Sequence, residues 1–477
     1  MHVYKIDRSH LLDAAPLALP GGPSHDVAAT IRSFDERDLP DGFPFVLDDD
    51  GRVGACASLN RYLREAWEQR AYTLTTLAGT HVYYLARFLQ FLRHRRASDL
   101  PAADLLDARR SDLTAYRDER AKLVSATSLR NEINVLGVFY EYAHAQGWID
   151  ADPIPRWGAS RRNTLVPRVR APRFEKFLSP DQTTHFLSAG LRGDTRPDLP
   201  RPAQPERDYA YGLLLVTTGL RRHEGALLLD IEIPRLGAMP TTAVHSFQLI
   251  GKGRRERTIH VVDDTVAALD LYRETDRART VRTAQPHLRR RLRDGDLLVV
   301  DSLDTSKHTP ILRIGRTRRP AHLLEPVERA RAVTINDDGT IEPLALFLGR
   351  GGLRPAPTYW NELFRDARDR VDRIDGPHRP PGHITVGPHT LRHTFAVQLL
   401  AALMKASRHR GDDPYYLLTS PLLTVQTILG HASFETTQRY LYAAETWQQE
   451  LPASLLHIAE RLRTHPAHDA SDDAGHP

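Results

Sequence analysis

A proline- and arginine-rich segment at residues 154–177 most constrains what this chain can fold into. Pro153, Pro155, Pro167 and Pro172 interrupt any helix across it. Its many arginines face almost no acidic residues, so the segment repels itself unless an anion lies alongside. Simple solubility of an exposed tether explains the same charge. In either case we expect a basic linker between two folded regions, as a length of 477 residues also suggests.

The segment before this linker, residues 55–153, has the pattern of a small helical domain. Val82, Leu85 and Leu89 fall on one helix face, while arginines occupy the other faces. These basic faces fit either a solvated surface or a nucleic-acid contact. Residues 1–54, which are rich in Pro, Gly and Asp, form an N-terminal extension to which the sequence assigns no function.

A second domain is expected over residues 178–450. The passage 208–230 resembles two helices joined at Gly219, a residue that can end a helix in a left-handed conformation. This turn would direct Arg221 toward a cleft. Glu224 lies three residues later on the same helix face, where it can hold an arginine in place, although such a pair is also common on ordinary helices.

Two strand candidates, residues 247–250 and 258–261, flank a basic turn at residues 251–255. Lys252 lies in this turn. A lysine there is normally only solvated, but lysine is rare in this chain, which favours a functional role. The abundance of arginine is explained by a GC-rich coding sequence as readily as by phosphate binding.

The stretch from His389 to Tyr440 contains groups suited to moving a phosphoryl group without a metal. Arg392 can hold two phosphate oxygens, and the imidazoles of His389, His393 and His431 can move or share protons. A tyrosine oxygen can attack phosphorus and form a covalent intermediate. Tyr440 could equally be a packing residue, and His389 with His393 has a spacing that can bind zinc, although no third ligand is obvious.

Several classes of protein are disfavoured. The N-terminus has no apolar run typical of a signal peptide, and no segment is long enough to cross a bilayer. A single cysteine, Cys56, excludes an internal disulfide and a cysteine-rich zinc site. We expect a cytoplasmic protein without cofactor or metal. At the C-terminus, residues 443–462 are amphipathic enough for a last helix, and 451–477 contains this helix end and a disordered tail.

Taken in order, these passages resemble the tyrosine recombinases, also called phage integrases. Each motif is weak by itself, but the ordered set is specific, and the resemblance covers about residues 59–450. Within this range, the segment from about 265 to 345 looks longer than in a minimal member of the family and would be an insertion. The motifs that carry it are Thr218–Glu224, Gly251–Gly253, His389–Phe395, Leu429–His431 and Thr436–Tyr440.

The resemblance implies a catalytic role for six residues. Two arginines would hold the scissile phosphate, a lysine would protonate the leaving 5′ oxygen, one histidine would accept or relay the nucleophile's proton, another would hydrogen-bond to the phosphate, and a tyrosine would form a 3′-phosphotyrosyl bond. In that order they are Arg221 and Arg392, Lys252, His389, His431 and Tyr440. Because a free tyrosine has a pKa of about 10, attack near neutrality needs such positive charge or a base.

Supporting and DNA-binding residues are expected around this set. Glu224 and His393 would support the catalytic side chains. The arginines expected to contact DNA lie in the linker and at the hairpin tip: Arg161, Arg162, Arg168, Arg170, Arg254 and Arg255.

The resemblance also implies a fold and partners. The fold would be mainly α with a small β-sheet: a helical SAM-like core-binding domain and an α+β catalytic domain that together form a C-shaped clamp. The partner would be double-stranded DNA, bound by a homotetramer on paired sites, and the activity would be site-specific recombination or integration of a mobile element. Two alternatives are a type IB topoisomerase-like enzyme and a DNA-binding regulator without catalysis.

Overall fold

The chain divides into two compact units, Met1–Ala171 and Pro172–Pro477, which we call the N-terminal unit and the C-terminal unit. The computed structural model describes most of both. The described residues are 1–13, 27–49, 56–100, 102–158, 162–167, 176–194, 199–236, 244–250, 256–305, 309–376, 385–409, 420–431 and 434–447. Among them, no helix combines the length and the apolar character needed to cross a membrane.

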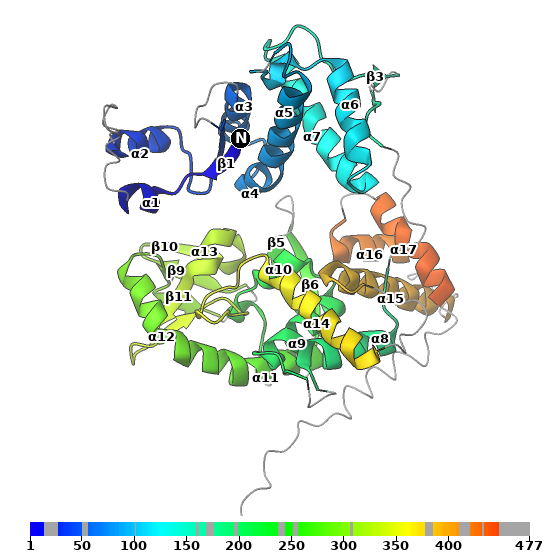
Figure 1. The fold of residues 1–477 in the computed structure, drawn as a ribbon. Helices are drawn as coiled ribbons and strands as arrows, with labels where there is room; N and C mark the ends of the chain where they lie inside the picture. The colour runs from blue at the N-terminus through cyan, green and yellow to red at the C-terminus, as the bar shows by residue number, and fades with distance from the viewer. Residues whose placement is uncertain are drawn as a thin grey trace, which may run out of the picture. The chain divides into compact units, whose positions relative to one another are not determined.

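The N-terminal unit is helical, with two short antiparallel pairs of strands (Figure 1). Its elements are β1 (His2–Lys5), α1 (Arg8–Asp13), α2 (Val27–Glu36), β2 (Pro44–Leu47), α3 (Ala57–Glu68), α4 (Leu74–Thr76), η2 (Leu77–His81), α5 (Val82–Arg95), η3 (Leu105–Asp107), α6 (Arg110–Ala121), α7 (Ala126–Ala145), β3 (Arg156–Trp157) and β4 (Arg162–Asn163). β1 pairs antiparallel with β2, and β3 pairs antiparallel with β4.

One apolar core joins the parts of this unit. The periodic residues of α5, including Val82, Leu85 and Leu89, are completely buried, as the helical pattern predicts. Val46 of β2 belongs to the same core, and so does Leu165, which follows β4. The described parts of the N-terminal extension and of the linker segment before residue 168 therefore pack with the helices.

The C-terminal unit is also mostly helical and carries several small sheets (Figure 1). Its elements up to β10 are α8 (Pro180–His185), η4 (Phe186–Arg192), α9 (Pro205–Thr218), α10 (Arg222–Ala226), η5 (Asp230–Glu232), β5 (Val244–Ile250), β6 (Glu256–Val262), α11 (Asp263–Tyr272), η6 (Arg273–Arg277), α12 (Ala278–Arg293), β7 (Leu298–Val299), β8 (Ser302–Asp304), β9 (Ile311–Ile314) and β10 (Thr317–Pro320). The remaining elements are η7 (Ala321–Leu323), α13 (Pro326–Arg331), β11 (Ala332–Ile335), β12 (Ile341–Pro343), α14 (Tyr359–Asp375), α15 (Pro388–His409), α16 (Pro421–Leu429) and α17 (Phe434–Trp447).

The small sheets are mostly antiparallel. β5 and β6 form the predicted hairpin, with Phe247 opposite Ile259, and its basic turn at 251–255 lies outside the described residues. β8, β9 and β10 form one three-stranded sheet. In the other, β11 pairs antiparallel with β12 and parallel with β7. The prediction of a mainly helical chain with small sheets is confirmed.

The core of the C-terminal unit is built around α9, which is buried on nearly all sides. Its residues Tyr211, Leu214 and Leu215 are completely buried, and the Tyr211 ring stacks on Trp360 of α14 with 3.8 Å between ring centroids. Because α9 cannot shift in this surrounding, its C-terminal end is a rigid support for the residues that follow it.

A last group of helices, α15, α16 and α17, shares a separate apolar cluster that includes Val397 and Tyr440. The prediction of a final helix beginning at residue 443 is wrong at its start, because α17 begins at Phe434 and already contains Tyr440. The polar Glu435 and Thr436 of its first turn hid this start from the apolar pattern. Residues 448–477 lie outside the described residues.

Candidate active site

The candidate site lies in the C-terminal unit, where the turn after α9 meets α15 and α16. Gly219 ends α9 with φ +66°, and a Cβ at this position would lie 2.3 Å from the Phe395 ring of α15. Only glycine therefore permits both the left-handed turn and the contact with α15. The turn sets Arg221 at the N-terminus of α10.

A buried carboxylate organises two of the site's arginines. Glu224 is 2% exposed. Its Oε2 accepts hydrogen bonds from the backbone N–H of Arg221 at 2.8 Å and from Nη2 of Arg257 at 2.6 Å, while its Oε1 accepts one from Nη1 of Arg221 at 2.8 Å. Burial alone would raise the pKa of Glu224, but the two guanidiniums outweigh it and hold the pKa below its ordinary value.

Arg392 of α15 is held by backbone carbonyls. Its Nη1 donates to the carbonyl oxygen of Gly219, and its Nη2 donates to that of Leu429 at 2.7 Å. The side chain is buried, and burial together with the nearby Arg221 lowers the pKa of Arg392 to about 10. A carbonyl dipole compensates a cation only partly, so this guanidinium keeps the capacity to attract an anion.

The guanidiniums of Arg221, Arg257 and Arg392 all donate hydrogen bonds to carbonyls at the C-terminal end of α16. The Leu429 carbonyl also accepts from Nη1 of Arg257 at 2.7 Å, and the Gly430 carbonyl accepts from Nη2 of Arg221 at 3.2 Å. A helix C-terminus carries partial negative charge, which favours cations there. Gly430 ends the helix with φ +63°, and a Cβ there would lie 2.6 Å from Nη1 of Arg257.

Histidines of α15 and of the turn after α16 surround Tyr440. Nδ1 of His393 lies 2.8 Å from the Tyr440 hydroxyl in a hydrogen bond, and the Tyr440 side chain is buried. The His431 ring stacks on Tyr440 with 6.0 Å between centroids, and its Nδ1 lies 3.0 Å from Oγ1 of Thr437. The His389 ring lies one helical turn before His393, 6.4 Å from it between centroids.

Burial and the neighbouring arginines keep two of these imidazoles neutral. Burial, followed by the positive charge of Arg392 and Arg221, lowers the pKa of His431 to about 4. Burial and Arg392 also lower the pKa of His389. A neutral imidazole can accept a proton or a hydrogen bond, whereas an imidazolium can only donate. At neutral pH both side chains are therefore available as acceptors.

A cavity of about 400 Å³ opens beside this cluster and is lined by Arg221, Arg257, His260 and His431, among others. Arg257 and His260 are absent from the predicted site. The signal for Arg257 is strand parity: it lies two residues before the buried Ile259 on β6, so both side chains point to the same, inward face. No comparable signal marks His260.

The other predicted site residues divide into two groups. Arg162 is described: it is exposed in β4 of the N-terminal unit. Outside the described residues lie Lys252, Arg254 and Arg255 of the hairpin turn, and Arg161, Arg168 and Arg170 of the linker. Within the described part of the chain, no group of three or more His, Cys, Asp or Glu side chains is arranged to hold a metal ion.

Comparison with known proteins identifies relatives of one kind. No family model matches the chain. It is similar to the tyrosine recombinase XerD of Pseudomonas putida, with 27% identity over 347 residues that cover 64% of this chain and 85% of the relative. It is also similar to the tyrosine recombinase XerD of Mycobacterium leprae, with 25% identity over 391 residues, 80% of this chain and 91% of the relative. Among solved structures, the XerH site-specific recombinase bound to its difH substrate matches 91% of this chain and 89% of its own, with 15% identity and a TM-score of 0.44.

Proposed function

We propose that this chain is a tyrosine recombinase, like the site-specific recombinases to which it is similar, and that it cleaves and rejoins double-stranded DNA through a 3′-phosphotyrosyl bond on Tyr440. The Tyr440 oxygen attacks phosphorus, the bond from phosphorus to the 5′ oxygen breaks, and that oxygen leaves with a proton. Attack by the free 5′ hydroxyl reverses the step. The covalent bond keeps the energy of the phosphodiester, so the cycle needs neither ATP nor a metal.

The observation that carries this proposal is the position of the Tyr440 hydroxyl, which is hydrogen-bonded to His393 beside a cluster of guanidiniums. His431 connects the two parts, since it stacks on Tyr440 and lines the cavity together with Arg221 and Arg257. Negative charge accumulates on a pentacoordinate phosphorus and must be stabilised by nearby positive charge. A phosphate in this cavity would meet that positive charge.

We assign the site residues the roles that the family resemblance implies, and the contacts of the described residues support part of this assignment. Arg221 and Arg392 hold the phosphate oxygens, and Glu224 fixes Arg221 in position. His431 hydrogen-bonds to the phosphate. Lys252, which lies outside the described residues, would protonate the leaving 5′ oxygen.

Two histidines share the work at the nucleophile. His393 holds the Tyr440 hydroxyl at rest, and His389, one turn away on α15, accepts or relays its proton. A comparison of His389→Gln with His393→Gln separates these roles. Loss of the proton relay in His389→Gln should slow cleavage most at a pH below the pKa of tyrosine, where the attack needs a base. Loss of the positioning bond slows cleavage by a similar factor at every pH.

The finer predictions extend this proposal. The helical N-terminal unit and the C-terminal unit would form a C-shaped clamp on the duplex, with linker arginines along the DNA backbone. Four subunits would assemble on two paired sites, because recombination cuts four strands in two pairs.

Covalent trapping tests the proposal. The full chain is incubated without metal or nucleotide on nicked duplexes carrying sequence from beside its own gene, and the products are separated on a denaturing gel. We expect a protein–DNA adduct for the parent chain and none for Tyr440→Phe. Tyr83→Phe is the matched control, because Tyr83 is 42% exposed on α5.

Each other outcome has a definite meaning. Binding to a cognate site without an adduct would favour the catalytically inactive regulator. Relaxation of supercoiled plasmid by a monomer without strand exchange would favour the type IB topoisomerase-like enzyme. An adduct that persists in Tyr440→Phe would assign the nucleophile to another tyrosine.

A further inference from the structure

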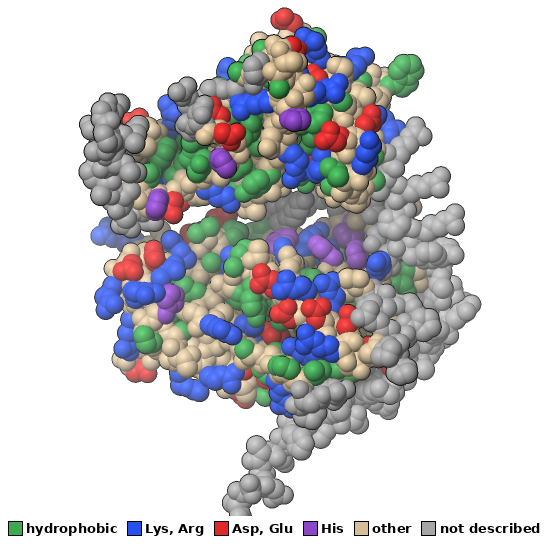
Figure 2. Space-filling model, viewed as in Figure 1, with side chains coloured by type: hydrophobic (Ala, Val, Ile, Leu, Met, Phe, Trp, Pro, Cys, Tyr) green, Lys and Arg blue, Asp and Glu red, His purple; other side chains and the backbone are tan. Residues whose placement is uncertain are grey.

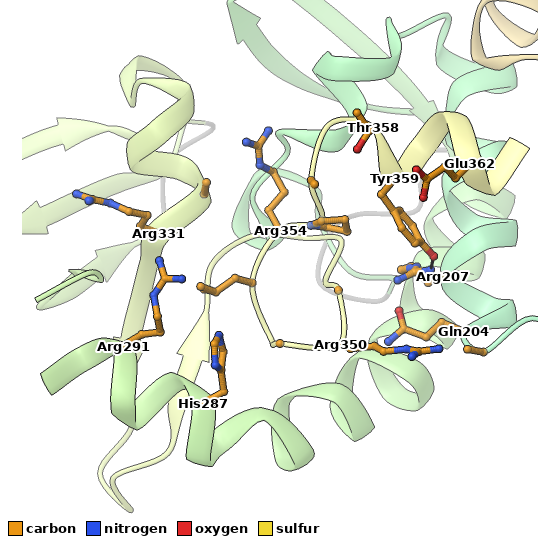
Figure 3. A pocket seen from close by; sticks show the side chains of 17 residues that line it. Gln204, Arg207, His287, Arg291, Arg331, Arg350, Arg354, Thr358, Tyr359 and Glu362 are labelled. Atoms are coloured by element: carbon orange, nitrogen blue, oxygen red, sulfur yellow. Dashed lines mark hydrogen bonds between the residues drawn. The ribbon is translucent and has the colours of Figure 1, made fainter. Parts of the chain in front are cut away.

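A second cavity in the C-terminal unit, of about 670 Å³, shares no lining residue with the candidate active site. It lies between α12, the end of α13, the loop at 349–356 and the start of α14 (Figure 3). Its lining includes one carboxylate, Glu362, and many cationic side chains. These are Arg207, Arg291, Arg331, Arg350 and Arg354, with His287 beside them.

Two of the arginines already have carboxylate partners. Nη2 of Arg207 donates to Oδ1 of Asp208 at 2.7 Å, and the Arg207 guanidinium also lies 4.8 Å from the centre of the Tyr359 ring. Arg291 forms an ion pair of 3.0 Å with Asp296. These two side chains form opposite walls of the cavity in Figure 3, with Arg354 between them.

The other three arginines form no ion pair with a carboxylate among the described residues, although the charge of Arg331 adds to the lowering of the pKa of Glu328 by Arg319. Nε of Arg331 and Nε of Arg354 are buried without a hydrogen bond. Burial lowers the pKa of Arg354, and no neighbouring carboxylate opposes that effect. Arg350 is exposed at the edge of the cavity. Because these cations line one cavity without an ion pair to a described carboxylate, the cavity favours a negatively charged ligand.

A glycine-rich loop forms one wall. Its sequence, Gly349-Arg350-Gly351-Gly352-Leu353-Arg354, has no part in the recombinase motifs. Gly352 has φ +76°, and a Cβ there would lie 2.6 Å from Cβ of Ala284 on α12. Glycine is thus required for the loop to approach α12. The absence of side chains at three positions also lets a bulky anion come close to the backbone.

From these observations we propose that the cavity binds clustered phosphate groups, as in a small polyphosphorylated molecule. A guanidinium binds phosphate through two parallel hydrogen bonds, and Figure 3 shows the guanidiniums of Arg331, Arg350 and Arg354 at separate places of the lining, which suits a ligand with more than one phosphate. The volume is that of a small-molecule site. The phosphates of a DNA backbone offer the same chemistry, and a competition experiment separates the two sources.

The test uses the full chain with inorganic tripolyphosphate as the probe, titrated in a calorimeter at constant ionic strength. Arg331→Gln and Arg354→Gln remove unpaired cations from two different elements. The control is Arg289→Gln, because Arg289 is an exposed arginine of α12 outside the cavity. We expect saturable one-to-one binding to the parent chain, weaker by on the order of tenfold or more in each cavity variant and unchanged in the control.

An added duplex of unrelated sequence identifies the source of the phosphates. Displacement of tripolyphosphate by the duplex would assign the cavity to the DNA backbone, and binding of both together would assign it to a free polyphosphate. Equal binding to the parent chain, both cavity variants and Arg289→Gln would overturn the proposal, as would the absence of saturable binding.

Thermal unfolding without the probe separates binding from folding. Because Arg354→Gln removes an unpaired, half-buried cation, the temperature midpoint of unfolding should stay at the parent's value or rise. A lower midpoint in both cavity variants would mean that these arginines support the fold, and the proposal would fail.

Discussion

Two buried glutamates, one in each unit, bind a pair of arginines each, yet their surroundings differ. In the N-terminal unit, Glu132 accepts hydrogen bonds from Arg87, Arg120 and the Tyr116 hydroxyl. In the C-terminal unit, Glu224 accepts from Arg221 and Arg257. Both carboxylates are 2% exposed.

The difference lies in what else the arginines meet. Around Glu132 an aromatic hydroxyl completes the cluster, and the Arg87 side chain is 43% exposed, so water shares its charge. Around Glu224 a third cation, Arg392, is held by carbonyls alone, and a cavity opens beside the group. The first arrangement is balanced and supports a fold. The second keeps excess positive charge directed at a space, which suits an anion.

The surface does not reveal this difference. Figure 2 shows basic and acidic side chains mixed over the visible face of each unit. Because an excess of arginine over the whole chain says little, the informative quantity is whether a buried guanidinium faces a carboxylate or a carbonyl.

The largest expected effect comes from removing the unbalanced cation. Arg392→Gln should slow formation of the covalent adduct by about 10³-fold, because it removes charge that stabilises the transition state. Single-turnover cleavage of a nicked duplex measures this. Arg120→Gln is the matched control in the balanced cluster and should leave the cleavage rate of the folded protein unchanged. Equal losses in both variants would break the comparison.

The reverse experiment tests the balanced cluster. Glu132→Gln leaves two arginines without their carboxylate and should cost about 3 kcal/mol of stability in the N-terminal unit. Denaturant unfolding followed by Trp148 fluorescence, close to Tyr142 of the same core, reports on this unit. The comparison fails if Glu132→Gln keeps the parent's stability but loses cleavage.

Two histidines allow a finer test. Burial alone lowers the pKa of His81 to about 4 in the N-terminal unit, whereas burial together with Arg392 and Arg221 lowers the pKa of His431 to about 4. Both pKa values lie below that of an unfolded histidine, about 6.5. Each histidine therefore contributes stability above about pH 6.5 that is lost as the pH falls toward 4.

An anion should distinguish these histidines. Inorganic phosphate in the active-site cavity would offset the arginines and make His431 roughly tenfold easier to protonate, while His81 should not change. NMR titration of both imidazoles with and without phosphate measures this, and His431→Gln assigns the signal. Equal shifts at both histidines would show that the arginines around His431 are already balanced.

The sequence predicts the parts of this site that depend on local rules. Gly219 and Gly430 end helices in the left-handed conformation for which glycine is suited, and the spacing of His389, Arg392 and His393 places them on one helix face. The family's ordered motifs add the functional interpretation. The structure brings Arg221, Arg392, His431 and Tyr440 into one site, although their catalytic roles stay predictions.

What the sequence misses depends on contacts between distant residues. The bond from Arg257 to the Leu429 carbonyl spans 172 positions, and no local pattern indicates it. The same holds for the choice of His393 as the partner of Tyr440, because two histidines one turn apart are equivalent until α17 is placed. The loop at 349–354 appears only as a run of glycines until α12 is seen against it.

The smallest expected effect concerns an exposed arginine that pairs with no described carboxylate. Arg162 is exposed on β4, and no described carboxylate pairs with it. If it contacts a DNA phosphate as predicted, Arg162→Gln should weaken duplex binding by a few-fold at every sequence and reduce the slope of log affinity against log salt by about one. Fluorescence anisotropy over a series of salt concentrations measures both quantities.

Arg64→Gln is the control, since Arg64 has an acidic partner four residues later in Glu68, 3.6 Å away. An unchanged slope in Arg162→Gln would remove Arg162 from the DNA contact and leave the excess of exposed arginine in the N-terminal unit as a solvated surface.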